Sequence, residues 1–169
     1  MVLRVAALPR PGQTISGGEF QTFGGGKGAN QAIAARRAGG SVSFIAAIGD
    51  DDLGRSAIKS LAAEGIDTSG ISVLPGTPSG VAFIFVSDSG ENCIGVAPGA
   101  NACLSPGVLL SQAHSFDNAD LMLIQLETPL ETVRTAVDMA EKRQLPVVLN
   151  PAPAAALPDD LLQGLFCIT

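Results

Sequence analysis

Apolar runs and helix-forming segments alternate along most of this chain of 169 residues. The apolar runs at 42–48, 121–126 and 146–149 are typical of strands that are buried in a parallel sheet. The first run is followed by helical periodicity at 52–63, and the second by helical periodicity from Pro129 to about residue 143. Because such alternation implies right-handed crossovers, we predict an α/β fold with a parallel central sheet flanked by helices.

Two segments interrupt this alternation, since they combine polar-apolar alternation with glycine turns and contain no helix. The first is 15–23, and the second is 80–96, which is typical of a hairpin with its turn at 87–90. We interpret these segments as a small β layer, attached to an α/β body, that is able to cover a site as a lid. The predicted division is lid strands at about 1–23 and 79–97, and a body at about 24–78 and 98–169.

Both ends of the chain lie inside segments that are typical of strands. Residues 2–5 begin in an extended segment, and 165–169 look like a strand that has only begun after a helix at 158–164. We therefore expect a fold that is truncated at both ends.

A glycine-rich turn leads directly into a strong helix-forming segment. The turn reads Gly24-Gly25-Gly26-Lys27-Gly28-Ala29-Asn30 and is followed by Gln31-Ala32-Ile33-Ala34-Ala35. Glycine lets a ligand approach the main chain closely, and the free N–H groups at a helix start favour oxygen-rich ligands. Lys27 and Asn30 add further donors and an acceptor, so we interpret this turn as a binding loop.

Three other interpretations of the glycine turn compete with a binding loop. A P-loop requires Ser or Thr after the lysine, and Gly28 stands there instead. A dinucleotide fingerprint is nominally met by Gly24, Gly26 and Ala29, but it should follow a buried strand, and the segment before it is half polar. A turn that only caps the helix leaves Lys27 and Asn30 unexplained. The last two interpretations stay open as weaker alternatives.

The charge balance and the apolar runs exclude some classes of partner. A net charge of −6 without any basic stripe argues against nucleic acid or an anionic membrane surface. No apolar run is long enough to span a bilayer, and the first residues do not follow a signal-peptide pattern. We therefore expect a cytoplasmic location.

The candidate metal-ligating residues do not form a convincing site. Cys93, Cys103 and Cys167 show neither metal-ligand nor redox spacing, and we expect them to be plain buried or half-buried thiols. His114 is the only histidine and is expected at the surface. The acidic run Asp50–Asp52 is better explained as capping of the helix that follows it than as a metal cluster. We assign no metal site.

The segment from Gly25 to Ala32 resembles the first signature of the ribokinase (PfkB-type) carbohydrate kinase family. Further similar motifs follow in the family's order over essentially the whole chain: Pro9-Arg10-Pro11-Gly12, Gly49-Asp50-Asp51, Gly90-Glu91-Asn92, Gly99-Ala100-Asn101, Gln125-Leu126-Glu127 and Asn150-Pro151-Ala152-Pro153. The resemblance implies a ribokinase-like fold, of which this chain is the N-terminal portion. It also implies a transfer of the γ-phosphoryl group of ATP to the 5-hydroxyl of D-ribose, with Mg²⁺ and a monovalent cation (K⁺).

The resemblance also implies roles for individual residues. The sugar would be bound by Gly26, Lys27, Gly28, Ala29, Asn30 and Glu127, with Ile94 or its neighbours facing it from the lid. Asn150 would shape the phosphate and metal region, and the lid would form a homodimer. Independently of the family, Glu127 follows a buried strand at the edge where α/β sheets place ligands. The alternatives are a helix N-terminal carboxylate at Glu127 and a turn residue at Asn150.

The family's catalytic aspartate lies in a Gly-Ala-Gly-Asp motif, and this chain does not contain that motif. We therefore assign no catalytic residue and expect the chain to have little kinase activity alone. The alternative function is a non-catalytic module that binds a sugar or a nucleoside. A dehydrogenase that uses the dinucleotide fingerprint is the weakest alternative.

Overall fold

The computed structural model describes all 169 residues, and its larger part is built on parallel strands. Strand β3 (Ala46–Gly49) pairs in parallel with β4 (Ile71–Leu74). Strands β7 (Met122–Ile124), β8 (Val147–Leu149) and β9 (Cys167–Ile168) form a second parallel sheet in this order. The predicted α/β class is confirmed. The predicted central sheet is divided into two pieces, because neither β3 nor β4 forms hydrogen bonds with β7, β8 or β9.

Helices connect these strands in the predicted alternation. Helix α2 (Asp52–Ala63) links β3 to β4 and ends shortly before Gly65, where φ is +78°. Helix α4 (Leu130–Glu141) links β7 to β8, and α5 (Asp159–Gln163) links β8 to β9. Helix α1 (Lys27–Arg37) follows the glycine turn as predicted. These elements, with the three short helices η1 (Gly99–Cys103), α3 (Pro106–Ser111) and η2 (Ala113–Phe116), form the part that we call the body.

The main core of the body lies between α4 and the sheet of β7, β8 and β9. Val133, Val137 and Ala140 share the predicted apolar face of α4 and are buried against Val147 of β8 and the residues around it. Leu130, which was predicted on the same face, is 38% exposed because it lies in the first position of the helix. Burial of one helix face against a sheet is the main stabilising interaction of such a layer.

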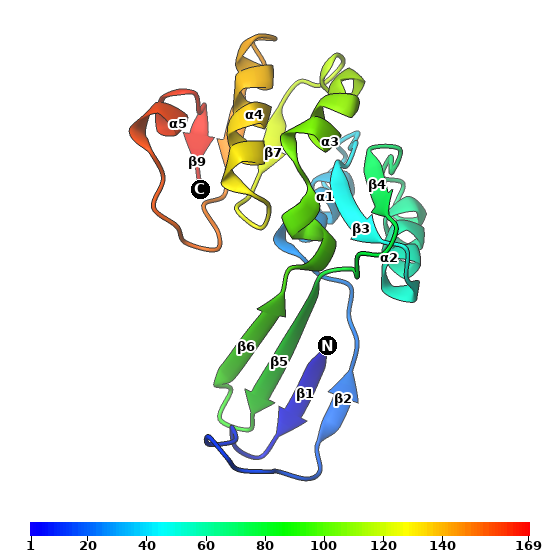
Figure 1. The fold of residues 1–169 in the computed structure, drawn as a ribbon, viewed down its shortest axis with the longest axis vertical. Helices are drawn as coiled ribbons and strands as arrows, with labels where there is room; N and C mark the ends of the chain where they lie inside the picture. The colour runs from blue at the N-terminus through cyan, green and yellow to red at the C-terminus, as the bar shows by residue number, and fades with distance from the viewer.

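Four strands form a separate sheet, called the small sheet below. They are β1 (Val2–Val5), β2 (Glu19–Gln21), β5 (Val81–Ser87) and β6 (Asn92–Ala97), in the order β2-β1-β5-β6. The predicted hairpin is confirmed by the antiparallel pair β5–β6. Figure 1 shows that the small sheet projects from the body and joins it at a narrow waist. Every residue of β2 and of β6 is exposed, so nothing within the chain covers these strands.

The prediction of buried or half-buried thiols is wrong, because all three cysteines are exposed. Cys93 lies on β6, an uncovered edge strand of the small sheet, and Cys167 lies on β9, an edge strand of the body. Cys103 ends η1. An apolar side chain is buried only where a neighbouring layer covers it, and at these positions no layer does. His114 is exposed, as predicted. No helix combines the length and the apolar character that a membrane span would require.

Candidate functional site

The amino end of α1 lies against Glu127, which follows the last residue of β7 by three positions. The Lys27 backbone N–H donates a hydrogen bond of 2.6 Å to Glu127 Oε2, and Lys27 Nζ donates one of 3.1 Å to Glu127 Oε1. The two residues are 100 positions apart in the chain. Their side chains keep 39% and 29% of their surface exposed, so the ion pair remains open to solvent on one side. The structure thus brings together two groups that the sequence singled out separately.

Gly26 shapes this contact through its backbone. It is the N-cap of α1 with φ +96° and ψ 135°, a conformation that residues with a side chain rarely adopt. No side chain within the turn caps the helix. The first N–H groups of a helix lack partners inside the helix, and the positive end of its dipole stabilises an anion. Glu127, which lies just after β7, therefore caps the amino end of α1.

A second pair of side chains joins α1 to the residue that directly follows β7. Gln125 Nε2 donates a hydrogen bond to Gln31 Oε1. A Cβ atom at Gly28 would lie 2.9 Å from Gln125 Oε1 and 3.3 Å from Phe44 Cε2, so glycine allows the close approach of strand and helix here. Sequence reasoning missed the roles of Gln31 and Gln125. Gln125 directly follows β7, so its place at the carboxyl end of a predicted buried strand is the signal that could have found it.

The remaining sugar-site candidates occupy different surroundings. Ala29 packs against the buried cluster of Ala32, Leu61 and Ile66, so its side chain faces the core. The Asn30 side chain is exposed and makes no hydrogen bond, while its backbone N–H donates to Gly26 O at 2.9 Å in the first turn of α1. A free amide beside a helix start offers both a donor and an acceptor to a ligand.

Two further candidates lie on separate elements. The Asn150 backbone N–H donates to Ile124 O at 2.9 Å, which places Asn150 at the carboxyl ends of β7 and β8. Its side chain forms no hydrogen bond within the chain. Ile94 lies on β6 of the small sheet and is 53% exposed, so it does not belong to the contacts around Glu127.

The acidic run before α2 caps that helix, which confirms the favoured interpretation of these residues. Asp51 Oδ1 accepts from the Gly54 N–H at 2.8 Å, and Asp50 and Asp52 pair with Arg55. Hydrogen bonds from the Ser79 hydroxyl, the Ser79 N–H and the Gly54 N–H lower the pKa of Asp51 to about 2. Within the chain, no group of three His, Cys, Asp or Glu side chains is placed to hold a metal ion.

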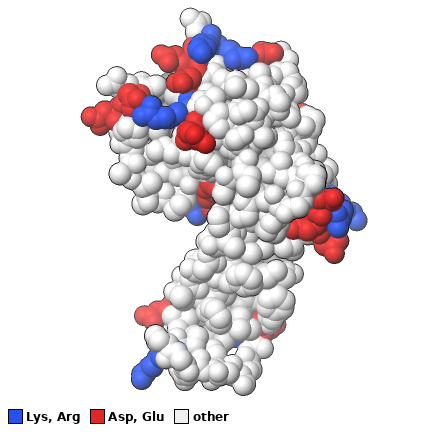
Figure 2. Space-filling view, viewed as in Figure 1, with Lys and Arg blue, Asp and Glu red and all other residues white.

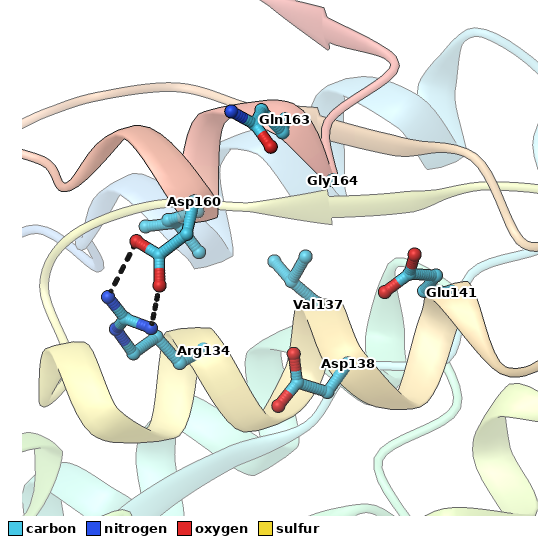
Figure 3. A pocket seen from close by; sticks show the side chains of 8 residues that line it. Arg134, Val137, Asp138, Glu141, Asp160, Gln163 and Gly164 are labelled. Carbon is cyan, nitrogen blue, oxygen red and sulfur yellow. Dashed lines mark hydrogen bonds and ion pairs between the residues drawn. The ribbon is translucent and has the colours of Figure 1, made fainter.

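Two marked hollows lie outside this site. One of about 410 Å³ lies between α4 and α5, where Arg134 forms a bidentate ion pair with Asp160. Asp138 and Glu141 line the same hollow further along α4 (Figure 3). Another of about 320 Å³ is lined by residues of the 5–18 segment beside the small sheet. Neither is lined by Lys27 or Glu127. The polar contacts between Lys27 and Glu127 therefore mark the candidate site.

The family described as pfkB family carbohydrate kinase matches residues 2–169. A ribokinase of Haemophilus influenzae is 45% identical over 168 residues, which cover 99% of this chain and 55% of the relative. A ribokinase of Bacillus subtilis is 38% identical over 161 residues, which cover 95% of this chain and 55% of the relative. The chain thus spans about half the length of the curated relatives that it matches.

The fold is also similar to that of solved ribokinases. The structure of Arabidopsis thaliana ribokinase complexed with ribose and ATP matches with a TM-score of 0.88 at 26% identity, over 99% of this chain and 55% of that chain. The predicted ribokinase-like fold is therefore confirmed.

Proposed function

Because this chain belongs to the pfkB family of carbohydrate kinases, we propose that it binds D-ribose for ATP-dependent phosphorylation to D-ribose 5-phosphate. One observation carries the proposal: the amino end of α1, with Lys27, meets the carboxylate of Glu127 at the carboxyl end of β7. Relatives named ribokinase and a neighbouring ribokinase structure with ribose and ATP support the choice of sugar and nucleotide.

The chemistry of the site suits a ligand with several hydroxyl groups. Such a ligand needs acceptors and donors placed side by side, because each hydroxyl both donates and accepts. Glu127 supplies carboxylate acceptors, and each of its oxygens has lone pairs beyond those that Lys27 uses. Lys27 Nζ and the exposed amide of Asn30 supply donors at the same helix end. A bound sugar would thus complete hydrogen bonds that the protein alone leaves open.

In the proposal, the small sheet serves as the lid of this site. A lid excludes water, and this both strengthens the polar contacts and protects a phosphoryl donor from hydrolysis. Ile94 would provide apolar cover over the sugar. The strand register places Ile94 on the same face as Ile84 and Val2, so this face would be turned toward the sugar.

The opposite face of the small sheet is proposed to pair with a second copy of the chain. Phe83 and Ile84 are neighbours on β5, so their side chains point to opposite faces of the small sheet. Phe20 of β2 is paired with Leu3 of β1, and both lie on the same face as Phe83. Phe20 and Phe83 are 61% and 50% exposed. Figure 2 shows few charged side chains over the small sheet, while most charges lie on the body. An apolar face of this kind favours association through the lid.

ATP, Mg²⁺ and K⁺ enter the proposal through the family. Asn150 lies at the same sheet edge as the strand that leads to Glu127, and we propose it for the phosphate region. Mg²⁺ would come with the phosphates of ATP, as it often does, since the chain offers no cluster of metal-ligating side chains of its own. No residue is assigned to K⁺. We expect the reaction in the cytoplasm, where ATP is available.

The alternative proposal is a module that binds a sugar or a nucleoside without phosphorylating it. It is favoured by the hydrogen-bonding groups that Lys27, Asn30 and Glu127 leave open, because a sugar or a nucleoside could occupy them without any phosphoryl transfer. Phosphoryl transfer depends on positioning and charge stabilisation, so we expect residues 1–169 alone to turn over ribose and ATP slowly. The two proposals differ in whether a nucleotide changes the binding of the sugar.

Calorimetric titration of the chain with D-ribose tests the proposed function. We expect binding that weakens about 10-fold or more in Glu127→Gln, since a hydrogen bond to a charged group contributes about 1.5–3 kcal/mol. Glu131→Gln is the matched control, because Glu131 is an exposed acid in the first turn of α4. Equal affinity of the Glu127 variant and the parent chain would contradict the proposed site.

Repeating the titration with a non-hydrolysable ATP analogue separates the two candidate functions. A change in ribose affinity on adding the analogue supports the kinase. Ribose binding without any effect of the nucleotide supports the binding module.

A further inference from the structure

The chain passes between the small sheet and the body at three places. These are the segment 22–26 before α1, the segment 78–80 before β5, and the segment 98–99 after β6. The small sheet can move relative to the body only if these three connecting segments change conformation. The packing of each segment against the body therefore decides how firmly the sheet is held. The three segments are packed very differently.

The segment before β5 is fastened to the body by the Asp51 carboxylate and by Gly49 at the end of β3. The Ser79 hydroxyl donates to Asp51 Oδ1 at 2.6 Å, and the Ser79 N–H donates to Asp51 Oδ2 at 2.7 Å. Asp51 Oδ1 also accepts from Gly54 N–H of α2, while Ser79 Oγ accepts from the Gly49 N–H at the end of β3. Ser79 is only 9% exposed. Asp51 thus joins the root of β5 to the amino end of α2.

The segment after β6 is locked to the segment before β5 by close backbone contacts. The Ala100 N–H donates to Pro78 O at 2.9 Å. A Cβ atom at Gly99 would lie 2.4 Å from Pro78 O, and one at Gly80 would lie 2.6 Å from Pro98 O. Two backbones that approach so closely behave as one unit, so whatever holds Ser79 also holds the root of β6.

The third segment has no such contacts at Gly24 and Gly25, which precede the N-cap Gly26. Gly24 and Gly25 are exposed, and a Cβ atom at either would meet nothing within 4 Å. Glycine also restricts the backbone less than any other residue. This attachment can follow a movement of the small sheet without resisting it, so the orientation of the sheet is set where the joined roots of β5 and β6 meet the body. Gly49 of β3 and the buried Ala100 contribute backbone and apolar packing there, and Asp51 supplies the side-chain hydrogen bonds.

We propose that Asp51 is a positioning residue that holds the small sheet at a fixed orientation relative to the body, by fastening the joined roots of β5 and β6 to the amino end of α2. Without it, the small sheet would swing about these roots while its own strand pairing and the body's core stay intact. That this orientation places Ile94 over a sugar rests on the function proposed above. The orientation itself can be measured without any ligand.

The exposed cysteines provide natural positions for the measurement. Cys93 lies on the small sheet, whereas Cys103 and Cys167 lie on the body. Spin labels on Cys93 and Cys167, in a Cys103→Ser background, report the distance between the two parts. Labels on Cys103 and Cys167, in a Cys93→Ser background, report a distance within the body. Electron–electron distance measurements then give the width of each distribution.

In Asp51→Ala, we expect the distribution between small sheet and body to broaden about twofold or more, because local openings widen once the contacts that hold a segment are lost. The distribution within the body should not change. Ser79→Ala removes one hydrogen bond to the carboxylate, so it should broaden the distribution between small sheet and body less than Asp51→Ala does. If Asp51→Ala does not fold, Ser79→Ala provides the test instead. Asp52→Ala is the matched control, since the Asp52 side chain is 99% exposed and contacts only Arg55.

Two results would overturn the inference. An unchanged distribution between small sheet and body in the Asp51 and Ser79 variants would show that the joint does not set the orientation. Broadening of both distributions would show that Asp51 supports the whole structure rather than positioning one part. Because no sugar is present, a failure of ribose binding in the separate titration would leave this result unaffected.

Discussion

Replacing Glu127 with alanine should destabilise the fold through two contacts of different strength. The Lys27 N–H donates to the carboxylate at 2.6 Å, and a hydrogen bond to a charged group contributes about 1.5–3 kcal/mol. The Lys27 Nζ contact at 3.1 Å joins side chains that are 39% and 29% exposed, where an ion pair contributes about 0–1 kcal/mol. Partial exposure lets water replace part of each contact. We therefore expect a loss of about 2 kcal/mol in the free energy of unfolding, about 1.5 of it from the backbone contact.

Lys27→Met separates the two contributions, because it removes the ion pair and leaves the backbone N–H in place. We expect it to cost only about 0.5 kcal/mol. In the Lys27→Met background, Glu127→Ala should still cost about 1.5 kcal/mol, since the helix start keeps its unpaired N–H.

Urea unfolding followed by far-ultraviolet circular dichroism measures these differences, because the chain contains no Trp or Tyr for fluorescence. If Glu127→Ala and Lys27→Met were equally destabilising, or if Glu127→Ala cost less than about 0.5 kcal/mol, the carboxylate would not cap α1. The site would then lack the contact on which its geometry depends.

Three further predictions follow from other parts of the structure. Leu149→Ala in β8 should cost about 2–5 kcal/mol in urea unfolding, because Leu149 is fully buried and its truncation leaves a cavity. The pKa of Asp51 is about 2, below its usual value of 3.8, so its carboxylate stabilises the fold above about pH 4. This stabilisation is lost as the pH falls through about 2, and the acid unfolding of Asp51→Asn should lack the loss. Phe83→Glu should convert a self-associating chain to monomer in size-exclusion chromatography, whereas Val96→Glu on the opposite face should not.

Each of these expectations has an outcome that contradicts it. A cost below about 1 kcal/mol for Leu149→Ala would mean that the residues around Leu149 close around the lost side chain. Identical acid unfolding of the parent chain and Asp51→Asn would show that the hydrogen bonds to the carboxylate do not favour its charged form. A parent chain that elutes as a clean monomer, or two variants that behave alike, would rule out pairing through the Phe83 face.

Helical periodicity and turn chemistry explain which elements could be predicted from the sequence. Helix α2 was predicted at its observed bounds because Asp51 marks its start and Gly65 its end, and both signals act within a few residues. The strand at 42–48 was predicted too long. The observed β3 begins at Ala46, and only an isolated bridge between Ser43 and Asp67 precedes it. Where a strand ends depends on its partner, which local residue preferences do not reveal.

The candidate site shows the same division. The glycine turn identified Gly26, Lys27 and Asn30, because backbone freedom and helix starts are local properties. Glu127 was assigned through the family resemblance, and its place after a buried strand supported the assignment independently. That its carboxylate caps α1 required the packing of segments 100 residues apart. The exposure of Cys93 was missed for the related reason that burial depends on what covers a strand, and nothing in the chain covers β6.

The sequence by itself determined the α/β class, the order of most elements and the loop that begins α1, because these depend on periodicity and on backbone preferences within a few residues. Only the tertiary structure decided that Glu127 faces Lys27, that Asp51 fastens the small sheet to the body, and that the parallel sheet is divided into two pieces. These features depend on contacts between distant segments. Hydrogen bonds of this kind form only when both partners are brought into place by the packing of the whole chain.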